Sequence, residues 1–231
     1  MNDVRTVSDT KRTFYSLHTR PINSIYRRVV EELMVEMHLL SVNVDFRYDP
    51  IYALGIVTTF DRFMQGYRPE QDKASIFSAL CRANGGEPEQ YRYDAEQALA
   101  QVAGMTLENF WQTLKDLPQE GIWGQLRANA ENPSFKYSRP YAIGLYTLLE
   151  TVDGDALKDE KRFIDDLKQL CEPLRLQPEK VQKDLELYRS NLDKMAQAQA
   201  VLEDILKAER KRKEEREKAK DAVTTPPAEG A

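Results

Sequence analysis

The most constraining feature of this chain is a set of apolar residues that recur at three- and four-residue steps between positions 22 and 40. Charged residues such as Arg27, Glu31 and Glu36 fall between them, on the opposite side of a helix. An apolar face backed by a charged face is typical of a helix that packs on a protein core. The members of the apolar face are Ile22, Ile25, Tyr26, Val29, Val30, Leu33, Met37 and Leu40.

Prolines and glycines then punctuate the chain at the places where helices begin and end. Asp49 and Pro50 predict a helix start, and the following residues to Met64 are apolar on most sides, which indicates a central buried helix. Pro69, Pro88, Pro140 and Pro178 open further helical segments, and Gly85, Gly104 and Gly154 close them. The β-branched runs expected of strands are missing. We therefore expect an all-α fold: a single helical domain of about nine helices with a long protruding C-terminal helix.

The last helical segment starts at Pro178 and meets no further glycine or proline before Pro226. Its apolar residues keep a 4-3 spacing, with Gln199 out of type, and they are Val181, Leu185, Tyr188, Leu192, Met195, Leu202 and Leu206. Such a seam packs against another helix, either of the same chain or of a partner chain. We expect a monomer, with self-association through residues 181–206 as the alternative.

Charge divides the end of the chain from the rest. Residues 207–220 hold eight Lys or Arg and four Glu, although the whole chain carries a net charge of −5. We expect a helical domain at 1–206, a charged helical extension at 207–221 and a disordered tail at 222–231. The part before the extension is therefore acidic, which argues against nucleic acid as a partner.

Few residues suggest chemistry. His18 and His38 are the only histidines, and neither has Cys or acidic residues at ligand spacing, so we expect capping or surface roles. Asp45 and Asp61 are expected to form structural ion pairs rather than to act in acid–base catalysis. The arginines expected as their partners are Arg20, Arg47 and Arg62. We identify no catalytic residues, no metal site and no cofactor.

Compartment signals are equally sparse. Cys81 and Cys171 lie in helical, partly apolar stretches without a Cys-x-x-Cys motif, which indicates reduced, packed thiols of an intracellular protein. The longest nearly apolar run, residues 51–60, is about half the roughly 20 residues that a membrane span needs. The N-terminus lacks an apolar signal region. We expect the chain to stay where it is made or to lie on a membrane surface.

Two surfaces are candidates for partner binding. The first mixes basic and aromatic residues near the N-terminus: Lys11, Arg12, Phe14, Tyr15, Arg20, Tyr26, Arg27 and Arg28. This mixture fits a recognition surface, and it equally fits a helix docked on the core with its basic side chains paired to acidic groups. The second candidate is a tail contact, with anionic lipid or nucleic acid, at Arg210, Lys211, Arg212 and Lys213. Interleaved glutamates weaken it, and such a run is usually a solvated helix face.

One family resemblance goes further than these patterns. The segments 8–28, 31–40, 49–55 and 60–69 include SDTKRTFYSLHTRPIN, EELMVEMHLL, DPIYALG and FDRFMQGYRP. This string resembles the thylakoid formation family, whose members are also called photosystem II biogenesis proteins. The resemblance extends to about residue 210 and is most specific before residue 70. Because the chain lacks a plant transit peptide, it is similar to the cyanobacterial form.

The resemblance implies a helical accessory factor of oxygenic phototrophs rather than an enzyme. It implies action in photosystem II biogenesis and repair and in thylakoid membrane organisation, together with the membrane-bound FtsH protease complex. The expected place is peripheral, on the cytoplasmic side of the thylakoid membrane or in the cytoplasm. A lipid- or pigment-handling protein that shapes thylakoid membranes is the alternative. The resemblance carries over no individual binding residues.

Overall fold

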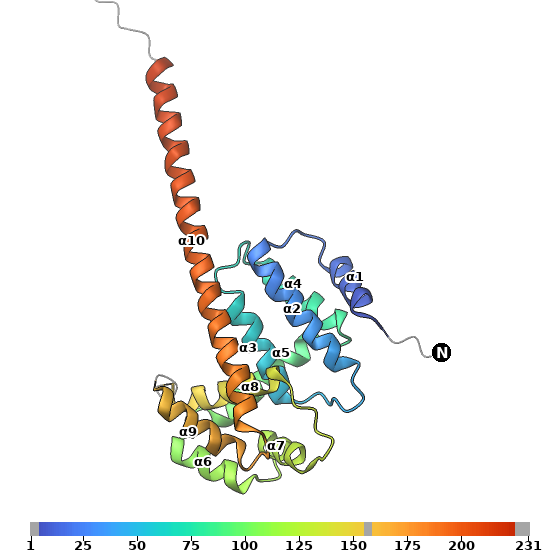
Figure 1. The fold of residues 1–231 in the computed structure, drawn as a ribbon. Coiled ribbons are helices and arrows are strands. Elements are labelled where there is room, and N and C mark those ends of the chain that lie inside the picture. Colours follow the sequence, from blue (N-terminus) through green and yellow to red (C-terminus); the bar gives the residue numbers. More distant parts are fainter. Residues whose placement is uncertain (1–4, 155–158, 225–231) are drawn as a thin grey trace, which may run out of the picture. The chain divides into compact units, whose positions relative to one another are not determined.

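The computed structural model describes residues 5–154 and 159–224. These residues form ten α-helices and no strand (Figure 1). The helices are α1 (Val7–Leu17), α2 (Ser24–Ser41), α3 (Pro50–Phe63), α4 (Asp72–Ala83), α5 (Pro88–Val102), α6 (Leu107–Asp116), α7 (Gly121–Glu131), α8 (Arg139–Val152), α9 (Glu160–Cys171) and α10 (Pro178–Thr224). The all-α class and the long C-terminal helix are confirmed, with one helix more than the nine or so expected.

The chain divides into two compact units, Met1–Ser190 and Asn191–Ala231. The first contains α1 to α9 and the start of α10. In the second, residues 191–224 continue α10 as a helix. Of the expected disordered tail at 222–231, residues 222–224 belong to α10 and residues 225–231 lie outside the described residues. The expected boundaries at 206 and 221 stay predictions.

Helix α3 is the centre of the first unit, as its composition predicts. Every residue from Ile51 to Phe60 is buried. Asp49 caps the helix by accepting hydrogen bonds from the backbone N–H groups of Ile51 and Tyr52, at 2.8 and 2.9 Å. α8 and α5 supply most of the packing around α3. A helix that is apolar on nearly all sides needs neighbours on all sides, and the fold provides them.

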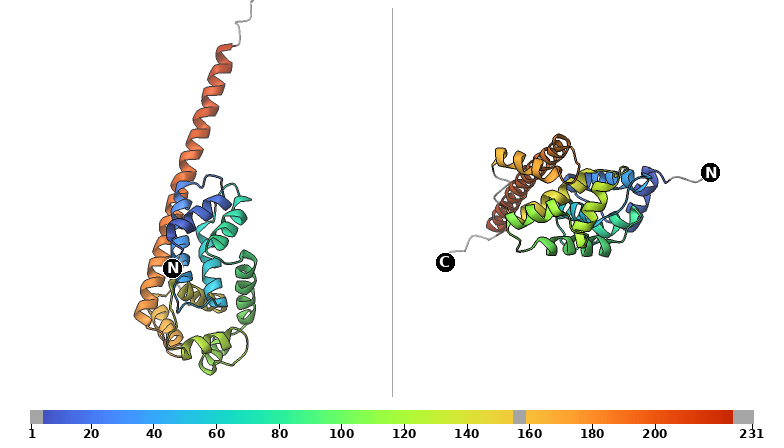
Figure 2. Two further views of the ribbon diagram at one scale, coloured as in Figure 1. Left: turned by 90° about the vertical axis from the view of Figure 1, so that its right-hand side faces the viewer. Right: turned by 90° about the horizontal axis from the view of Figure 1, so that it is seen from below.

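Of the remaining helices of the first unit, α1, α2 and α4 pack together as one group, and α2 runs beside α3 (Figures 1 and 2). α6, α7 and α9 lie away from that group. An ion pair joins α2 to the start of α8, where Arg139 donates to both carboxylate oxygens of Glu36 at 2.8 and 3.2 Å. A two-bond pair of this kind fixes orientation as well as distance.

The start of α10 packs within the first unit. Val181, Leu185 and Tyr188 of the 4-3 seam are buried, and the Tyr188 ring lies 5.9 Å from the ring of Phe63 in an edge contact. For these three positions the seam packs against helices of the same chain. In the second unit, Val201 and Ile205 are 59% and 51% exposed.

Both histidines differ from the expected surface role. His18 does cap the end of α1, but its side chain is buried, and its Nδ1 lies 3.0 Å from Ser75 Oγ. His38 is also buried, with Nδ1 at 2.8 Å from Thr10 Oγ1. Each ring therefore joins α1 to a neighbouring helix. A sequence cannot reveal this, because the contacting residues lie 28 and 57 positions away.

The expected ion pairs are also different. Asp61 is bound by Arg92 of α5, while the neighbouring Arg62 is bound to Glu150 of α8. Arg47 donates to the backbone carbonyl oxygens of Val44 and Phe46, at 2.7 and 2.8 Å. The partners of Asp61 and Arg62 come from other helices, which local spacing could not identify. Cys81 and Cys171 are buried free thiols, as expected.

Candidate functional site

The N-terminal basic residues meet α2 at one shared carboxylate. Lys11 Nζ lies 2.8 Å from Glu31 Oε2, and the Tyr15 hydroxyl donates to Glu31 Oε1 at 2.6 Å. These bonds, with a smaller contribution from the charge of Arg27, hold the pKa of Glu31 below its usual range. Burial and the same carboxylate raise the pKa of Tyr15 to about 12. The cluster fixes α1 on α2.

The other basic residues of this region are paired but remain more exposed. Arg12 lies 3.4 Å from Asp9 with 79% of its side chain exposed, and Arg28 lies 2.9 Å from Glu32 with 84% exposed. Arg20 binds the buried carboxylate of Asp72 on α4. Exposed pairs contribute little to stability, roughly 0–1 kcal/mol each. Arg12 and Arg28 thus keep most of their surface available to another molecule.

Two residues of the N-terminal partner-binding candidate, Phe14 and Tyr26, are buried in the core. Phe14 is fully buried, and Tyr26 is 4% exposed. The Tyr26 ring makes an edge contact with Tyr67 at 5.0 Å between centroids, and its hydroxyl donates to the Gln65 carbonyl oxygen at 3.2 Å. Both side chains are therefore removed from the candidate contact. Their large apolar rings anchor α1 and α2 in the core instead.

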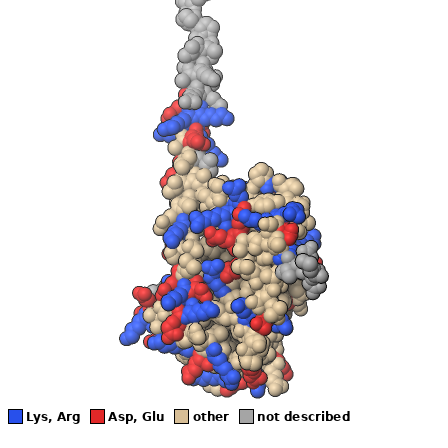
Figure 3. All heavy atoms as spheres, turned by 45° about the vertical axis from the view of Figure 1, so that its right-hand side comes forward, with Lys and Arg blue, Asp and Glu red and all other residues tan. Residues whose placement is uncertain are grey.

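The structure thus places α1 as a helix docked on the core, with its basic side chains paired to acidic groups. Lys11, Tyr15 and Arg27 are brought together around Glu31, whereas Arg20 belongs to a separate contact with α4. On the face drawn in Figure 3, Lys and Arg side chains alternate with Asp and Glu. Partner binding by Lys11, Arg12, Tyr15, Arg20, Arg27 and Arg28 stays a prediction.

The four basic residues of the candidate tail contact lie in the second unit. Arg210, Lys211, Arg212 and Lys213 are all exposed. Because successive residues turn by about 100° around an α-helix, four consecutive positions cannot share one face. Their charge therefore surrounds the helix, and tail contact with lipid stays a prediction.

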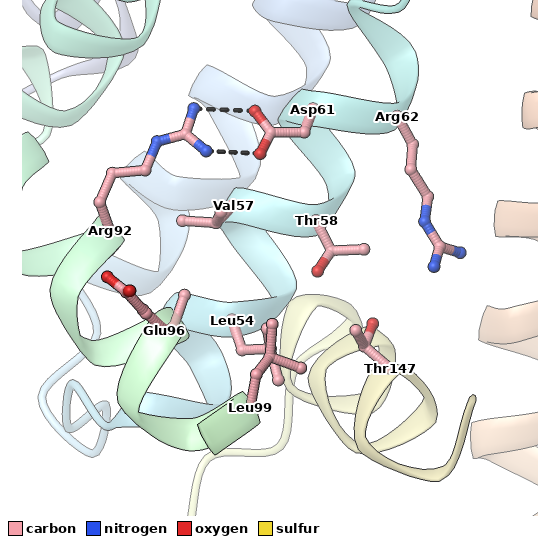
Figure 4. A pocket seen from close by; sticks show the side chains of 10 residues that line it. Leu54, Val57, Thr58, Asp61, Arg62, Arg92, Glu96, Leu99 and Thr147 are labelled. Carbon is pink, nitrogen blue, oxygen red and sulfur yellow. Dashed lines mark hydrogen bonds and ion pairs between the residues drawn. The ribbon is translucent and has the colours of Figure 1, made fainter. Parts of the chain in front are cut away.

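A groove in the first unit is a feature that the sequence did not identify. It lies between α3, α5 and α8 and has a volume of about 470 Å³. Figure 4 shows Val57 below the Asp61–Arg92 pair and Thr58 on the side toward Arg62, with Leu54 and Leu99 farther down. The signal in the sequence was the spacing of seven residues from Leu54 to Asp61 and from Arg92 to Leu99. That spacing reads equally well as ordinary core packing.

The rest of the described structure offers no metal centre and no membrane span. Within residues 5–154 and 159–224, no three or more His, Cys, Asp and Glu side chains are grouped so that they could hold a metal ion. In the same part of the chain, no helix has both the length and the apolarity to cross a membrane.

Comparison with known proteins identifies the family. The profile described as "Thylakoid formation protein" matches residues 6–217. Protein Thf1 of Trichormus variabilis is 60% identical over 99% of this chain and 100% of its own length. Protein Thf1 of Nostoc punctiforme is 58% identical over 98% of each chain. A solved structure of Psb29 superposes with a TM-score of 0.82 at 48% identity, covering 90% of this chain and 98% of that one. The chain therefore belongs to the thylakoid formation protein family.

Proposed function

We propose that this protein is a non-enzymatic accessory factor in photosystem II biogenesis and repair and in thylakoid membrane organisation. It acts by binding and stabilising the membrane-bound FtsH protease complex from the cytoplasmic side, as a peripheral protein. Membership of a family described by thylakoid formation supports the process. The FtsH partner rests on the resemblance of residues 8–69 to that family.

The observation that carries the binding mode is the rigid docking of α1 on α2. Lys11 and Tyr15 hold the two helices together through Glu31, while the Arg12 and Arg28 side chains are more than three-quarters exposed. A surface that is already ordered loses little conformational entropy when it binds. Exposed guanidinium groups on such a surface are suited to recognise carboxylates of a partner.

Co-purification tests this proposal. Tagged protein from thylakoid extracts is expected to recover FtsH, and the Arg12→Glu/Arg28→Glu variant is expected to recover less. Arg127→Glu is the matched control, because Arg127 also pairs with a Glu four residues later, on α7. If FtsH never co-purifies while other peripheral factors recover their partners, the adaptor function is wrong. If FtsH is retained by the double variant, the adaptor remains but uses another surface.

A second candidate function is lipid or pigment handling, and the basic collar at 210–213 is what favours it. Clusters of Lys and Arg are attracted to anionic membrane surfaces in a salt-dependent manner. Sedimentation with anionic vesicles separates the two functions. Binding that is lost in high salt and after truncation at residue 207 supports lipid handling. Equal sedimentation with and without vesicles excludes it.

A further inference from the structure

Helix α1 is held to the first unit by one line of side chains. Thr10, Phe14 and the C-cap residue His18 follow one another at four-residue steps, so they lie on one side of the helix, and all three are buried. The packing partners of α1 are α2 and α4, and Figure 1 shows α1 at the edge of the first unit. The side of α1 that packs on the core therefore presents one buried aromatic ring with a polar contact before it and after it.

A histidine ring makes each of these polar contacts. His38 Nδ1 of α2 lies 2.8 Å from Thr10 Oγ1, and His18 Nδ1 lies 3.0 Å from Ser75 Oγ of α4. The two histidines are 3% and 2% exposed. His18 Nε2 is buried and has no hydrogen-bond partner among the described residues. A protonated ring carries N–H groups on both nitrogens, so one N–H of His18 would be buried without an acceptor. Docking of α1 therefore favours the neutral ring.

The charges around the two rings are mixed in sign. They are Asp72 of α4 and Arg20 of the linker for His18, and Arg5 and Asp9 of the α1 segment for His38. Asp72 favours a protonated His18, but its carboxylate is bound to Arg20. Each ring also lies at the carboxyl end of a helix, where the helix dipole favours a cation. Burial has the larger effect, and it lowers the pKa of both histidines.

The other contacts in this region do not oppose a release of α1 by itself. Lys11 and Tyr15 bind Glu31, and these bonds lower the pKa of Glu31, so this contact stays ionised and unchanged from pH 7 to pH 5.5. Residues 18–23, which join α1 to α2, form no helix, and within them Arg20 is held separately by Asp72. α1 can therefore leave its site without any movement of α2 or α4.

We propose that α1 is a pH-sensitive switch, which leaves α2 and α4 when His18 and His38 are protonated, while the remaining helices of the first unit stay folded. Once α1 is released, both rings bind protons as ordinary histidines do, below a pH of about 6.5. Docking is thus complete above that pH and weakens as the pH falls. Each histidine raises the ratio of released to docked α1, its opening constant, by at most about tenfold per pH unit. This inference does not depend on FtsH being the partner.

Hydrogen exchange tests the proposal. Full-length protein is labelled at several pH values between 7 and 5.5, with labelling times scaled so that the intrinsic exchange of a free amide is matched at each pH. Peptides covering residues 7–17 report the opening of α1, and peptides covering residues 51–60 report the unfolding of the buried helix α3. Because a helix at the edge opens at a lower free energy than the whole unit, α1 should have the larger opening constant at every pH. That constant is expected to rise by about tenfold from pH 7 to pH 5.5.

The His18→Gln/His38→Gln variant should abolish this rise, because glutamine keeps a hydrogen-bonding side chain that does not titrate. Tyr15→Phe is the matched control. It loses the hydroxyl bond to Glu31, so α1 should open more at every pH with an unchanged pH dependence. If the double variant does not fold by circular dichroism, the two single variants replace it, and each should keep about half of the logarithmic rise. The proposal is overturned by an opening constant of α1 that is flat with pH, that equals the opening constant of α3, or that keeps its full pH dependence without the histidines.

Discussion

Gly55 of α3 lies against the backbone of Pro140 of α8, so closely that a Cβ atom at position 55 would come within 1.7 Å of the Pro140 carbonyl oxygen. The contact is reciprocal. A Cβ atom at Gly144 of α8 would lie 2.0 Å from the carbonyl oxygen of Ile51. Glycine permits such close approach of two backbones. The central helix pair is therefore set by two residues that have no side chain.

We predict that Gly55→Ala and Gly144→Ala each destabilise the fold by about 1–3 kcal/mol or more. The obstacle is backbone rather than a flexible side chain, so it cannot be relieved locally. Urea unfolding followed by circular dichroism should show a lower midpoint for both variants. Gly154→Ala is the control, because its added Cβ would meet only Glu150 O at an ordinary 3.6 Å. An unchanged midpoint for Gly55→Ala would contradict the close crossing.

The second prediction concerns Asp49, the buried cap of α3. Asp49→Ala removes the acceptor of two backbone N–H groups and should cost about 1–2 kcal/mol. Burial raises the pKa of Asp49 to about 6, so the folded protein binds this proton more tightly than the unfolded chain. The stability gained by binding this proton is fully present below the pKa that the Asp49 carboxyl has in the unfolded chain. It is lost as the pH rises through the folded pKa of about 6. Asp49→Asn keeps an acceptor without the charge.

The Asn variant should therefore gain stability relative to wild type between pH 4 and pH 7, by about 1–3 kcal/mol. Urea unfolding of both proteins across this range measures the difference. Because all other titrating groups are shared, they cancel in the comparison. A difference that stays flat with pH would show that Asp49 ionises as freely in the fold as in the unfolded chain.

The third prediction concerns the two buried histidines. Burial lowers the pKa of His18 and of His38. The charges of Asp72 and Arg20 also act on His18, and those of Arg5 and Asp9 act on His38. In the unfolded chain a histidine has a pKa of about 6.5, so below this pH the unfolded chain binds protons that the folded protein does not bind. The contribution of the neutral histidines to the free energy of unfolding is fully present above this pH. It should fall as the pH drops toward the lower pKa values of the folded protein, by at most about 1.4 kcal/mol per pH unit for each histidine.

Comparing wild type with the His18→Gln/His38→Gln variant isolates this effect. The variant is expected to be less stable at neutral pH, yet its unfolding free energy should decline less between pH 7 and pH 5. Guanidinium unfolding at several pH values provides the measurement. Parallel pH profiles for the two proteins would mean that neither histidine carries the dependence.

The fourth prediction is that the isolated protein is a monomer. Val181, Leu185 and Tyr188 already pack within the first unit. Beyond them the seam is interrupted at Gln199 and ends before Glu209, which is short of the three to four heptads that a coiled coil needs. Sedimentation velocity over a concentration series should give one species near 26.7 kDa. A mass that doubles with concentration would favour association through residues 181–206.

Helix starts and buried helices were predicted well where neighbouring residues, such as a capping Asp followed by Pro, favour a single backbone conformation. Asp49 followed by Pro50 identified the start of α3, and the unbroken apolar run after it identified the buried helix. Long-range contacts gave no such signal. Asp61 was expected to pair with an arginine near it in the chain or with Arg20, yet it binds Arg92, 31 residues away. Many arginines could reach it in principle, and only helix packing selects one.

The candidate surface shows the same limit. Phe14 and Tyr15 are adjacent aromatic residues, and no local pattern predicts different environments for them. In the structure Phe14 is fully buried, whereas Tyr15 is 37% exposed and donates to Glu31. Their environments differ because adjacent helical residues point about 100° apart, and only the docking of α1 decides which direction is the core.

The helical class, most helix boundaries and the family can be derived from the sequence, because capping residues, periodicity and motif strings act within a few residues of one another. Helix packing settles the rest: which charges pair, which aromatic rings are buried, how closely α3 and α8 cross, and that a groove remains beside them. Those properties depend on the relative placement of residues far apart in the chain, and local conformational preference carries no information about that placement.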